Sequence, residues 1–239
     1  MKIFSADDSS SLREALRSCL PAVGARIRRD QGAAETWVLL RAIDALDLAA
    51  RLSFPVTLSK RERPDFELAM PGSITGVEVS ECIPQTYARV QAIAEDMQHA
   101  GPLWRDAFEG LPTAVSRDEL ERRITSPPKT YGYNGDSMEA LAAGDLSNSI
   151  DLKLMARAKP GFTIYRENWL LLYSNTGRPG LDFAQVLERL RSSSHWIGSF
   201  SQLLILHSQT LAVSRGNGFS VLSVPDLMRS ADAATTARR

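Results

Sequence analysis

RPDFELAMPGSITGVEVSE, residues 63–81, contains two extended runs that flank a turn signal. The first run covers residues 66–70, the turn is Pro71-Gly72-Ser73, and the second run covers residues 74–79. A Pro-Gly pair between two runs of β-favouring residues is typical of a hairpin or a tight strand connection. The segment therefore predicts two neighbouring strands of one sheet.

Two acidic residues lie at defined places in this hairpin. Asp65 follows Pro64 at the start of the first strand, and Glu78 lies between Val77 and Val79 near the end of the second. Because side chains alternate along a strand, the two valines face one side and Glu78 faces the other. An unpaired charge is costly to bury. Glu78 is therefore expected either on a hydrated face or at a bound cation.

The spacing Pro64-Asp65, twelve residues, then Glu78-Val79-Ser80 resembles the signature of the PD-(D/E)XK nuclease superfamily, which has the restriction-endonuclease-like fold. The resemblance implies that Asp65 and Glu78, together with the Val79 carbonyl, bind Mg²⁺ or Mn²⁺. In that superfamily a lysine two residues after the glutamate assists the attacking water. Here that position is Ser80, so the chain is similar to a divergent member that lacks the lysine of the motif.

The order of the expected elements supports this resemblance. The superfamily core runs helix, three strands, helix, strand. The sequence predicts the same order for an amphipathic helix, three β-favouring runs, a second helix that begins near residue 137 or 145, and an apolar strand, at residues 35–52, 54–58, 66–70, 74–79, 145–158 and 168–174. The predicted fold class is thus α/β (α+β), a mixed central sheet flanked by helices.

The remaining segments give the expected domain organisation. Residues 1–33 are expected to form an N-terminal helical segment and residues 34–228 a single nuclease-like domain. Residues 85–137, with two helical stretches and a Pro- and Gly-rich loop, are expected to be an insertion in this domain. Residues 229–239 are small and polar, and are expected to form a flexible tail.

Two further residues are candidates for the site, each with an alternative. Several superfamily members replace the missing lysine with one from the second helix, which suggests Lys153; the alternative is a surface lysine, and Lys60 or Lys159 would be considered next. Helices at the position of residues 35–52 sometimes lend an acid to the metal site, which suggests Glu35. The alternative for Glu35 is an acid placed in a first helical turn by the helix dipole.

Composition limits the partners that can be expected. The formal net charge is zero, so any nucleic-acid contact needs a local basic surface, and only five residues are lysine. Two cysteines, Cys19 and Cys82, make no disulfide framework and no metal-ligand spacing, which favours a reducing, cytoplasmic compartment. The apolar runs are too short for a membrane span, and no signal peptide is recognised.

The resemblance implies metal-dependent hydrolysis of a phosphodiester, with DNA as the expected substrate. Asp65, Glu78 and Lys153 would form the catalytic set. The alternative is a catalytically inactive nuclease-like fold that binds nucleic acid or protein, because a fold does not fix a function. Ser80 favours the inactive alternative, whereas the presence of both Asp65 and Glu78 favours the enzyme.

Overall fold

The protein is described by a computed structural model that covers residues 1–20, 30–112, 114–128, 135–174, 181–192, 195–215 and 218–225. The expected tail at residues 229–239 lies outside these residues. Strands run at β1 (Lys2–Ala6), β2 (Val56–Lys60), β3 (Phe66–Met70), β4 (Ser73–Glu81), β5 (Glu167–Ser174), β6 (Gln202–His207), β7 (Thr210–Arg215) and β8 (Gly218–Ser223). Helices run at α1 (Ser9–Cys19), α2 (Gln31–Leu48), α3 (Gln85–Asp96), α4 (Arg117–Thr125), α5 (Ser137–Arg157) and α6 (Phe183–Arg191), with a short 3₁₀ helix, η2, at Arg105–Phe108.

The described strands form one mixed sheet whose spatial order follows the chain from β1 to β8. The predicted hairpin is confirmed, because β3 and β4 pair antiparallel from Phe66 opposite Val77 to Met70 opposite Ser73. Gly72 in its turn has a φ of 74°, a conformation that glycine adopts without a steric cost. The prediction that three successive strands are joined by the strand at residues 168–174 is also confirmed, since β2, β3, β4 and β5 are consecutive neighbours.

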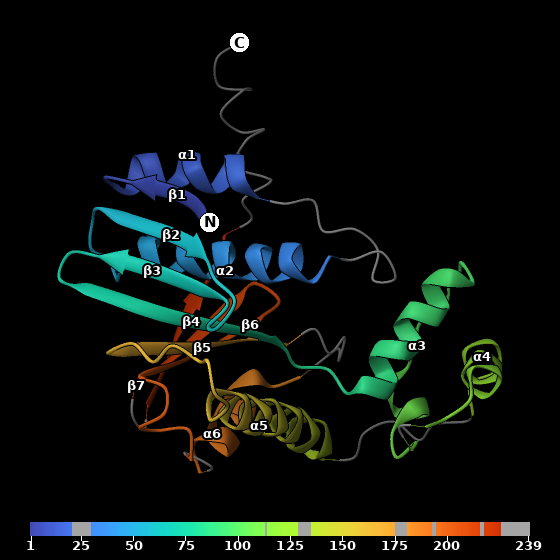
Figure 1. The fold of residues 1–239 in the computed structure, drawn as a ribbon. Coiled ribbons are helices and arrows are strands. Elements are labelled where there is room, and N and C mark those ends of the chain that lie inside the picture. The colour runs from blue at the N-terminus through green and yellow to red at the C-terminus, as the bar shows by residue number, and fades with distance from the viewer. Residues whose placement is uncertain are drawn as a thin grey trace.

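The centre of the sheet is parallel. Strand β4 pairs parallel with β5, and β5 pairs parallel with β6. Parallel neighbours need a crossover connection, and the chain makes the first through α3, α4 and α5 and the second through α6. Helices α5 and α6 cover one face of the sheet, while α1 and α2 cover the other (Figure 1).

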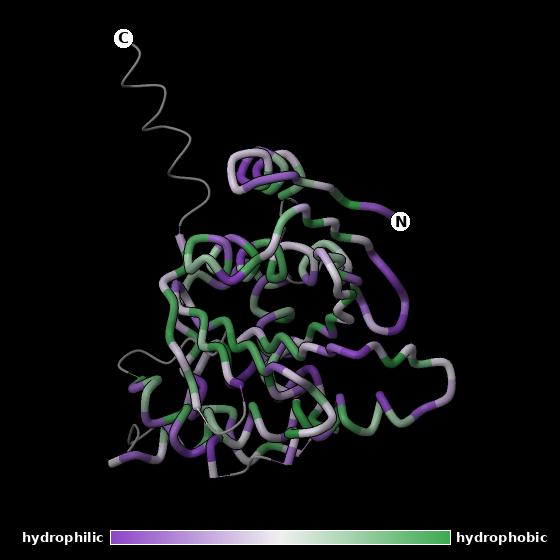
Figure 2. Tube along the Cα trace, turned by 90° about the vertical axis from the view of Figure 1, so that its left-hand side faces the viewer, coloured by the Kyte–Doolittle hydropathy of each residue, from purple (hydrophilic) through white to green (hydrophobic). Residues whose placement is uncertain are grey.

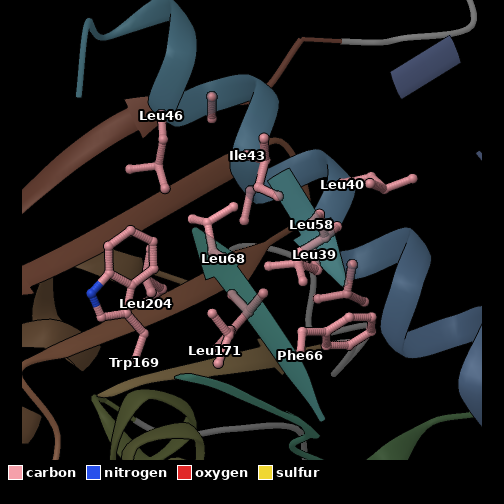
Figure 3. Close-up of a cluster of buried hydrophobic side chains, with 14 of the residues drawn as sticks. Leu39, Leu40, Ile43, Leu46, Leu58, Phe66, Leu68, Trp169, Leu171 and Leu204 are labelled. Carbon is pink, nitrogen blue, oxygen red and sulfur yellow. The ribbon is translucent and has the colours of Figure 1, made fainter. Parts of the chain in front are cut away.

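Each face of the sheet has its own apolar core. On the first face, the buried leucines and isoleucine of α2 pack over β2, β3 and β5 (Figure 3). Labelled residues of this core are Leu39, Leu40, Ile43, Leu46, Leu58, Phe66, Leu68, Trp169, Leu171 and Leu204. On the opposite face, Leu170 and Leu172 of β5 pack with residues of α5 and α6. Strand β5 is therefore buried on both sides, which explains its continuous apolar sequence.

The distribution of hydropathy along the chain agrees with this layered arrangement. Figure 2 shows hydrophobic stretches gathered in the middle of the molecule and hydrophilic stretches mostly at its periphery. None of the helices in the described ranges is both long enough and apolar enough to cross a membrane.

The region predicted as an insertion carries a small apolar core of its own. Helices α3, η2 and α4 lie to one side of the sheet (Figure 1) and bury Tyr87, Val90, Phe108 and Leu120 together. An ion pair between Arg105 of η2 and Asp145 of α5 ties this helical group to the sheet-covering layer.

The N-terminal region differs from the expectation of a purely helical segment. Besides α1, residues 1–33 contain β1, an edge strand that pairs antiparallel with β2. Its Phe4 and Ala6 are buried while Ser5 between them is exposed, so this part of the strand follows a two-residue period. Five residues hold too few repeats of that period to stand out in a sequence. Helix α2 also begins earlier than expected, at Gln31.

Replacing Leu68 with alanine tests the core that supports the hairpin. Leu68 is fully buried on β3 against α2, so its truncation removes apolar contacts and leaves a cavity. We expect the free energy of unfolding in urea to fall by about 2–5 kcal/mol. Val221→Ala on β8, whose side chain is largely exposed, is the control and should cost less than about 1 kcal/mol. Equal losses in both variants would contradict the packing described.

Candidate functional site

The two acids of the hairpin meet where β3 and β4 begin to diverge. The register that pairs Phe66 with Val77 places Asp65 opposite Glu78. Asp65 Oδ2 accepts a hydrogen bond from the Val79 backbone N–H at 2.8 Å, so the first acid is anchored to the strand that carries the second. A further hydrogen bond, from the Arg61 N–H to the Asp65 carbonyl at 2.8 Å, closes the turn that leads into β3.

Lys153 of α5 reaches this pair from the helical layer that covers the sheet on the side of Glu78. Its Nζ donates to Glu78 Oε1 at 2.7 Å, across 75 positions of the sequence. The Glu78 side chain is only 10% exposed, and its second oxygen, Oε2, has no hydrogen-bond partner within the described part of the chain. Lys153 thus contacts Glu78 and is partly buried, while its role in catalysis stays a prediction.

The electrostatic environment of Asp65 reflects its two acidic neighbours. Burial and, after it, the nearby Glu78 and Glu35 carboxylates raise the pKa of the Asp65 carboxyl to about 6, against the opposing effects of the Val79 N–H and Lys153. A carboxyl group whose pKa is raised by other carboxylates marks a place where negative charge is concentrated. Positive charge is favoured at this point of the structure.

A second carboxylate–lysine pair lies beside the first. Glu35 of α2 accepts from Lys60 Nζ of β2 at 2.6 Å, and the same ammonium lies 4.1 Å from the centre of the Phe66 ring. Asp30 caps α2 by accepting from the Gly32 and Ala33 N–H groups, so Glu35 stands in the second turn. The helix dipole acts mainly on the first turn, so it does not account for an acid at this position.

The Glu35–Lys60 contact was missed at the level of sequence. The strand expected at residues 54–58 ends too early, because β2 continues to Lys60. An extension of the alternating pattern by two residues would have placed Lys60 on the sheet, where a helix-borne acid can reach it.

A cavity of about 420 Å³ opens between α2, α5 and the carboxyl ends of β4 and β5. Helices α2 and α5 lie on opposite faces of the sheet there (Figure 1). The residues that line the cavity are Gln31, Ala34, Glu35, Val38, Val79, Ser80, Glu81, Lys153 and Tyr173. The cavity thus brings Lys153 and Glu35 together with Ser80, the residue at the position of the motif lysine.

The oxygen atoms at this point suit a hard divalent cation. Mg²⁺ and Mn²⁺ favour carboxylate, carbonyl and water oxygens. Asp65 and Glu78 supply carboxylates, and Oε2 of Glu78 is buried without a hydrogen-bond partner in the described ranges. Because the N–H and C=O groups of one strand residue project to the same side, the Val79 carbonyl points toward the side where Asp65 lies.

The site does not contain a dense cluster of side-chain ligands. Across the residues that the structure describes, three or more His, Cys, Asp or Glu side chains do not gather at metal-binding spacing. A cation here would therefore depend on Asp65, Glu78 and a backbone oxygen, with water completing its shell. This is the ligand set that the motif implies.

Cys82 and His207 lie in packed surroundings that suit a structural role. Burial raises the pKa of the Cys82 thiol to about 12, so the thiol stays protonated and is a poor nucleophile or ligand. Burial lowers the pKa of His207, which stacks on Phe183 at 5.0 Å between ring centres and contacts the Ser174 carbonyl oxygen. His207 is therefore a packed histidine.

Gly76 controls how closely the turn that carries Asp65 approaches β4. A Cβ atom at Gly76 would lie 2.6 Å from the Tyr165 ring and 2.8 Å from Cγ of Pro64. Pro64 is buried and directly precedes Asp65. The absence of a side chain at Gly76 thus allows Pro64 and Tyr165 to pack on the strand two residues before Glu78.

No family model, no curated protein and no solved structure matches the chain. What can be said of its function therefore rests on the site itself.

Replacing Gly76 with alanine should displace the turn. The added methyl collides with a rigid proline ring and a packed tyrosine, so we expect a loss of about 1–3 kcal/mol in unfolding free energy. Gly144→Ala on α5 is the matched control: a Cβ there meets nothing within 4 Å, and alanine favours a helix over glycine by about 1 kcal/mol. Urea denaturation of both variants is the measurement, and a stabilised Gly76→Ala protein would contradict the close packing.

Asp65→Asn should change how stability depends on pH. The folded-state pKa of about 6 exceeds the ordinary 3.8, so the folded protein holds its proton more tightly and wild-type stability falls as pH rises from about 4 to about 6. Asparagine can still accept from the Val79 N–H but does not ionise. We expect Asp65→Asn to gain stability relative to wild type across that window, by on the order of 2 kcal/mol, with a constant difference above it.

The measurement is urea unfolding of both proteins at pH 4–8 with a chelator present, so that no metal compensates the carboxylates. A stability difference that does not change between pH 4 and pH 7 would show that Asp65 ionises without cost in the folded protein.

Proposed function

We propose that this protein is a metal-dependent phosphodiester hydrolase that acts on nucleic acid, with DNA as its substrate. The observation that carries the proposal is the 2.7 Å contact between Lys153 and Glu78, beside Asp65. It brings an ammonium group to two hairpin acids from a helix, where the motif lysine is replaced by Ser80.

The order of elements also supports the proposal. Helix α2, strands β2 to β4, helix α5 and strand β5 follow one another in the order of the PD-(D/E)XK core, with α3, η2 and α4 inserted before α5. Asp65 directly precedes the second of these strands, and Glu78 lies on the third. Glu35 projects into the cavity from the first helix, the position from which some members lend an additional acid.

Asp65, Glu78 and the Val79 carbonyl would hold Mg²⁺ or Mn²⁺, which when bound polarises a phosphate and lowers the pKa of a water. The chain's own residues then have distinct tasks. Asp65 is held in place by the Val79 N–H, so it needs little rearrangement to act. Lys153 lines the cavity and can present its ammonium to negative charge that develops on the phosphate, which is the main way such groups lower a barrier.

A second candidate function is a nuclease-like fold without catalysis that binds nucleic acid or protein. Two observations favour it. Ser80 occupies the motif position, and both Glu35 and Glu78 already have a lysine partner, so their charges are compensated without a cation. A salt bridge of this kind can serve structure alone, and removing one partner of a buried pair is destabilising.

A cleavage assay separates the two candidates. We expect wild-type protein with Mg²⁺ or Mn²⁺ to cleave single- or double-stranded DNA, and Asp65→Ala to lose this activity. Lys153→Ala should lose on the order of 10²–10³ in rate, the usual cost of removing one group that stabilises developing charge. Lys2→Ala, which removes an exposed lysine of the edge strand β1, is the control and should cleave like wild type.

Full activity of Lys153→Ala beside inactive Asp65→Ala would leave a nuclease whose lysine we have assigned wrongly. No cleavage by wild type with varied metals and substrates would favour the binding protein. Titration calorimetry with Mn²⁺ completes the test, since equal binding by wild type, Asp65→Ala and Glu78→Ala would refute shared coordination. Circular dichroism of each variant establishes that it is folded.

A further inference from the structure

A surface groove of about 620 Å³ lies beside the turn that carries Asp65, apart from the cavity. Its described lining consists of Arg61, Glu62, Arg63, Gly161, Thr163 and Tyr165. The groove therefore joins the turn before β3 to the segment between α5 and β5. Tyr165 is common to the groove and to the packing over Gly76, which connects the groove with the strand that bears Glu78.

The two arginines of the groove differ in their availability. Arg61 donates to Glu67 at 2.8 Å, and Glu67 also accepts from the Tyr165 hydroxyl at 2.8 Å, so this guanidinium is already engaged. Arg63 is exposed, and within the described ranges its guanidinium contacts a carbonyl oxygen, that of Pro160 at 3.5 Å, and no carboxylate. Arg63 can therefore turn to an anion without breaking an ion pair.

The backbone around Arg63 is held in place. Its carbonyl accepts from the Thr163 N–H at 3.2 Å, which fastens the turn to the segment that follows α5. The groove stays open at Gly161, where a Cβ would meet nothing within 4 Å. Glu62 is the carboxylate among the described lining residues, and it is exposed to solvent, where its repulsion of an anion is screened.

The groove and the cavity lie along one line of the sheet. Tyr165 of the groove covers Gly76, and Ser80 lines the cavity. Gly76 and Ser80 are four residues apart on β4, which separates the groove from the cavity by roughly 13 Å at the rise of a strand. Glu78 lies between them. Each strand of a duplex carries one phosphate per about 3.4 Å of helix axis, so a polynucleotide at Glu78 extends over both regions whereas a single phosphodiester does not.

We infer that the groove binds a backbone phosphate of the substrate strand next to the one that is cleaved, through the Arg63 guanidinium with the Thr163 hydroxyl beside it. This inference rests on the proposed function and adds that the substrate strand carries a bound phosphate beyond the scissile bond. Arg63 would act in binding and positioning, since it does not reach the reacting atoms.

The test is the salt dependence of binding. Fluorescence anisotropy of labelled 20-nucleotide single- and double-stranded DNA is measured with Ca²⁺ in place of Mg²⁺, with gels to verify that the DNA stays intact. Arg63→Ala should weaken binding on the order of tenfold and reduce the slope of log affinity against log salt by about 1, as expected for one lost phosphate contact. Arg63→Lys should retain most of the slope, because the charge remains.

Arg17→Ala, which removes an exposed arginine of α1 in the opposite layer, is the matched control and should leave affinity and slope unchanged. Arg63→Gln removes the charge but keeps the aliphatic start of the side chain and an N–H donor, and it replaces the alanine variant if that variant unfolds. A folded Arg63→Ala or Arg63→Gln protein with wild-type affinity and salt slope would overturn the inference. If the wild-type protein cleaves DNA at the same time, the proposed function still stands. Absence of DNA binding by folded wild-type protein would overturn the inference as well, and the absence of cleavage would then remove the proposed function with it.

Discussion

Two carboxylates that face each other across diverging strands, Asp65 and Glu78, impose the constraint on which this structure depends. Like charges in a partly buried place repel, and each loses hydration on folding. A hydrogen bond from the Val79 backbone N–H stabilises Asp65, and the Lys153 ammonium stabilises Glu78. Around them, burial of β5 on both faces and the packing of α2 hold the surrounding strands in position.

The parallel pairing of β4 and β5 explains why the lysine can come from a helix. A parallel crossover returns the chain over one face of the sheet, and α5 is the last element of that crossover before β5 begins. The helix that covers the face on which Glu78 projects is therefore the one that precedes the neighbouring strand. A lysine late in α5 meets Glu78 without any distortion of the hairpin.

Much of the central fold could be predicted from the sequence, because its signals are local. The turn at Pro71-Gly72 and the apolar run of β5 each depend on a few adjacent residues, and both strands were found. Strand β1 was missed since five residues of mixed polarity carry little pattern, and its pairing with β2 is set by tertiary contacts. In the candidate site, the spacing of the motif predicted that Asp65 and Glu78 lie together. The Glu35–Lys60 contact joins residues 25 positions apart and has no local signature.

The sequence distance between Lys153 and Glu78 has a consequence for how the protein folds. Contacts between residues far apart in a chain form only after long loops have closed, so they belong to the slower part of folding. The hairpin can assemble early from neighbouring residues, but it then holds two acids without their ammonium. Completion of the site thus waits for the second half of the chain, and a chain that has emerged from the ribosome only as far as the hairpin carries two acids without the ammonium group that balances them.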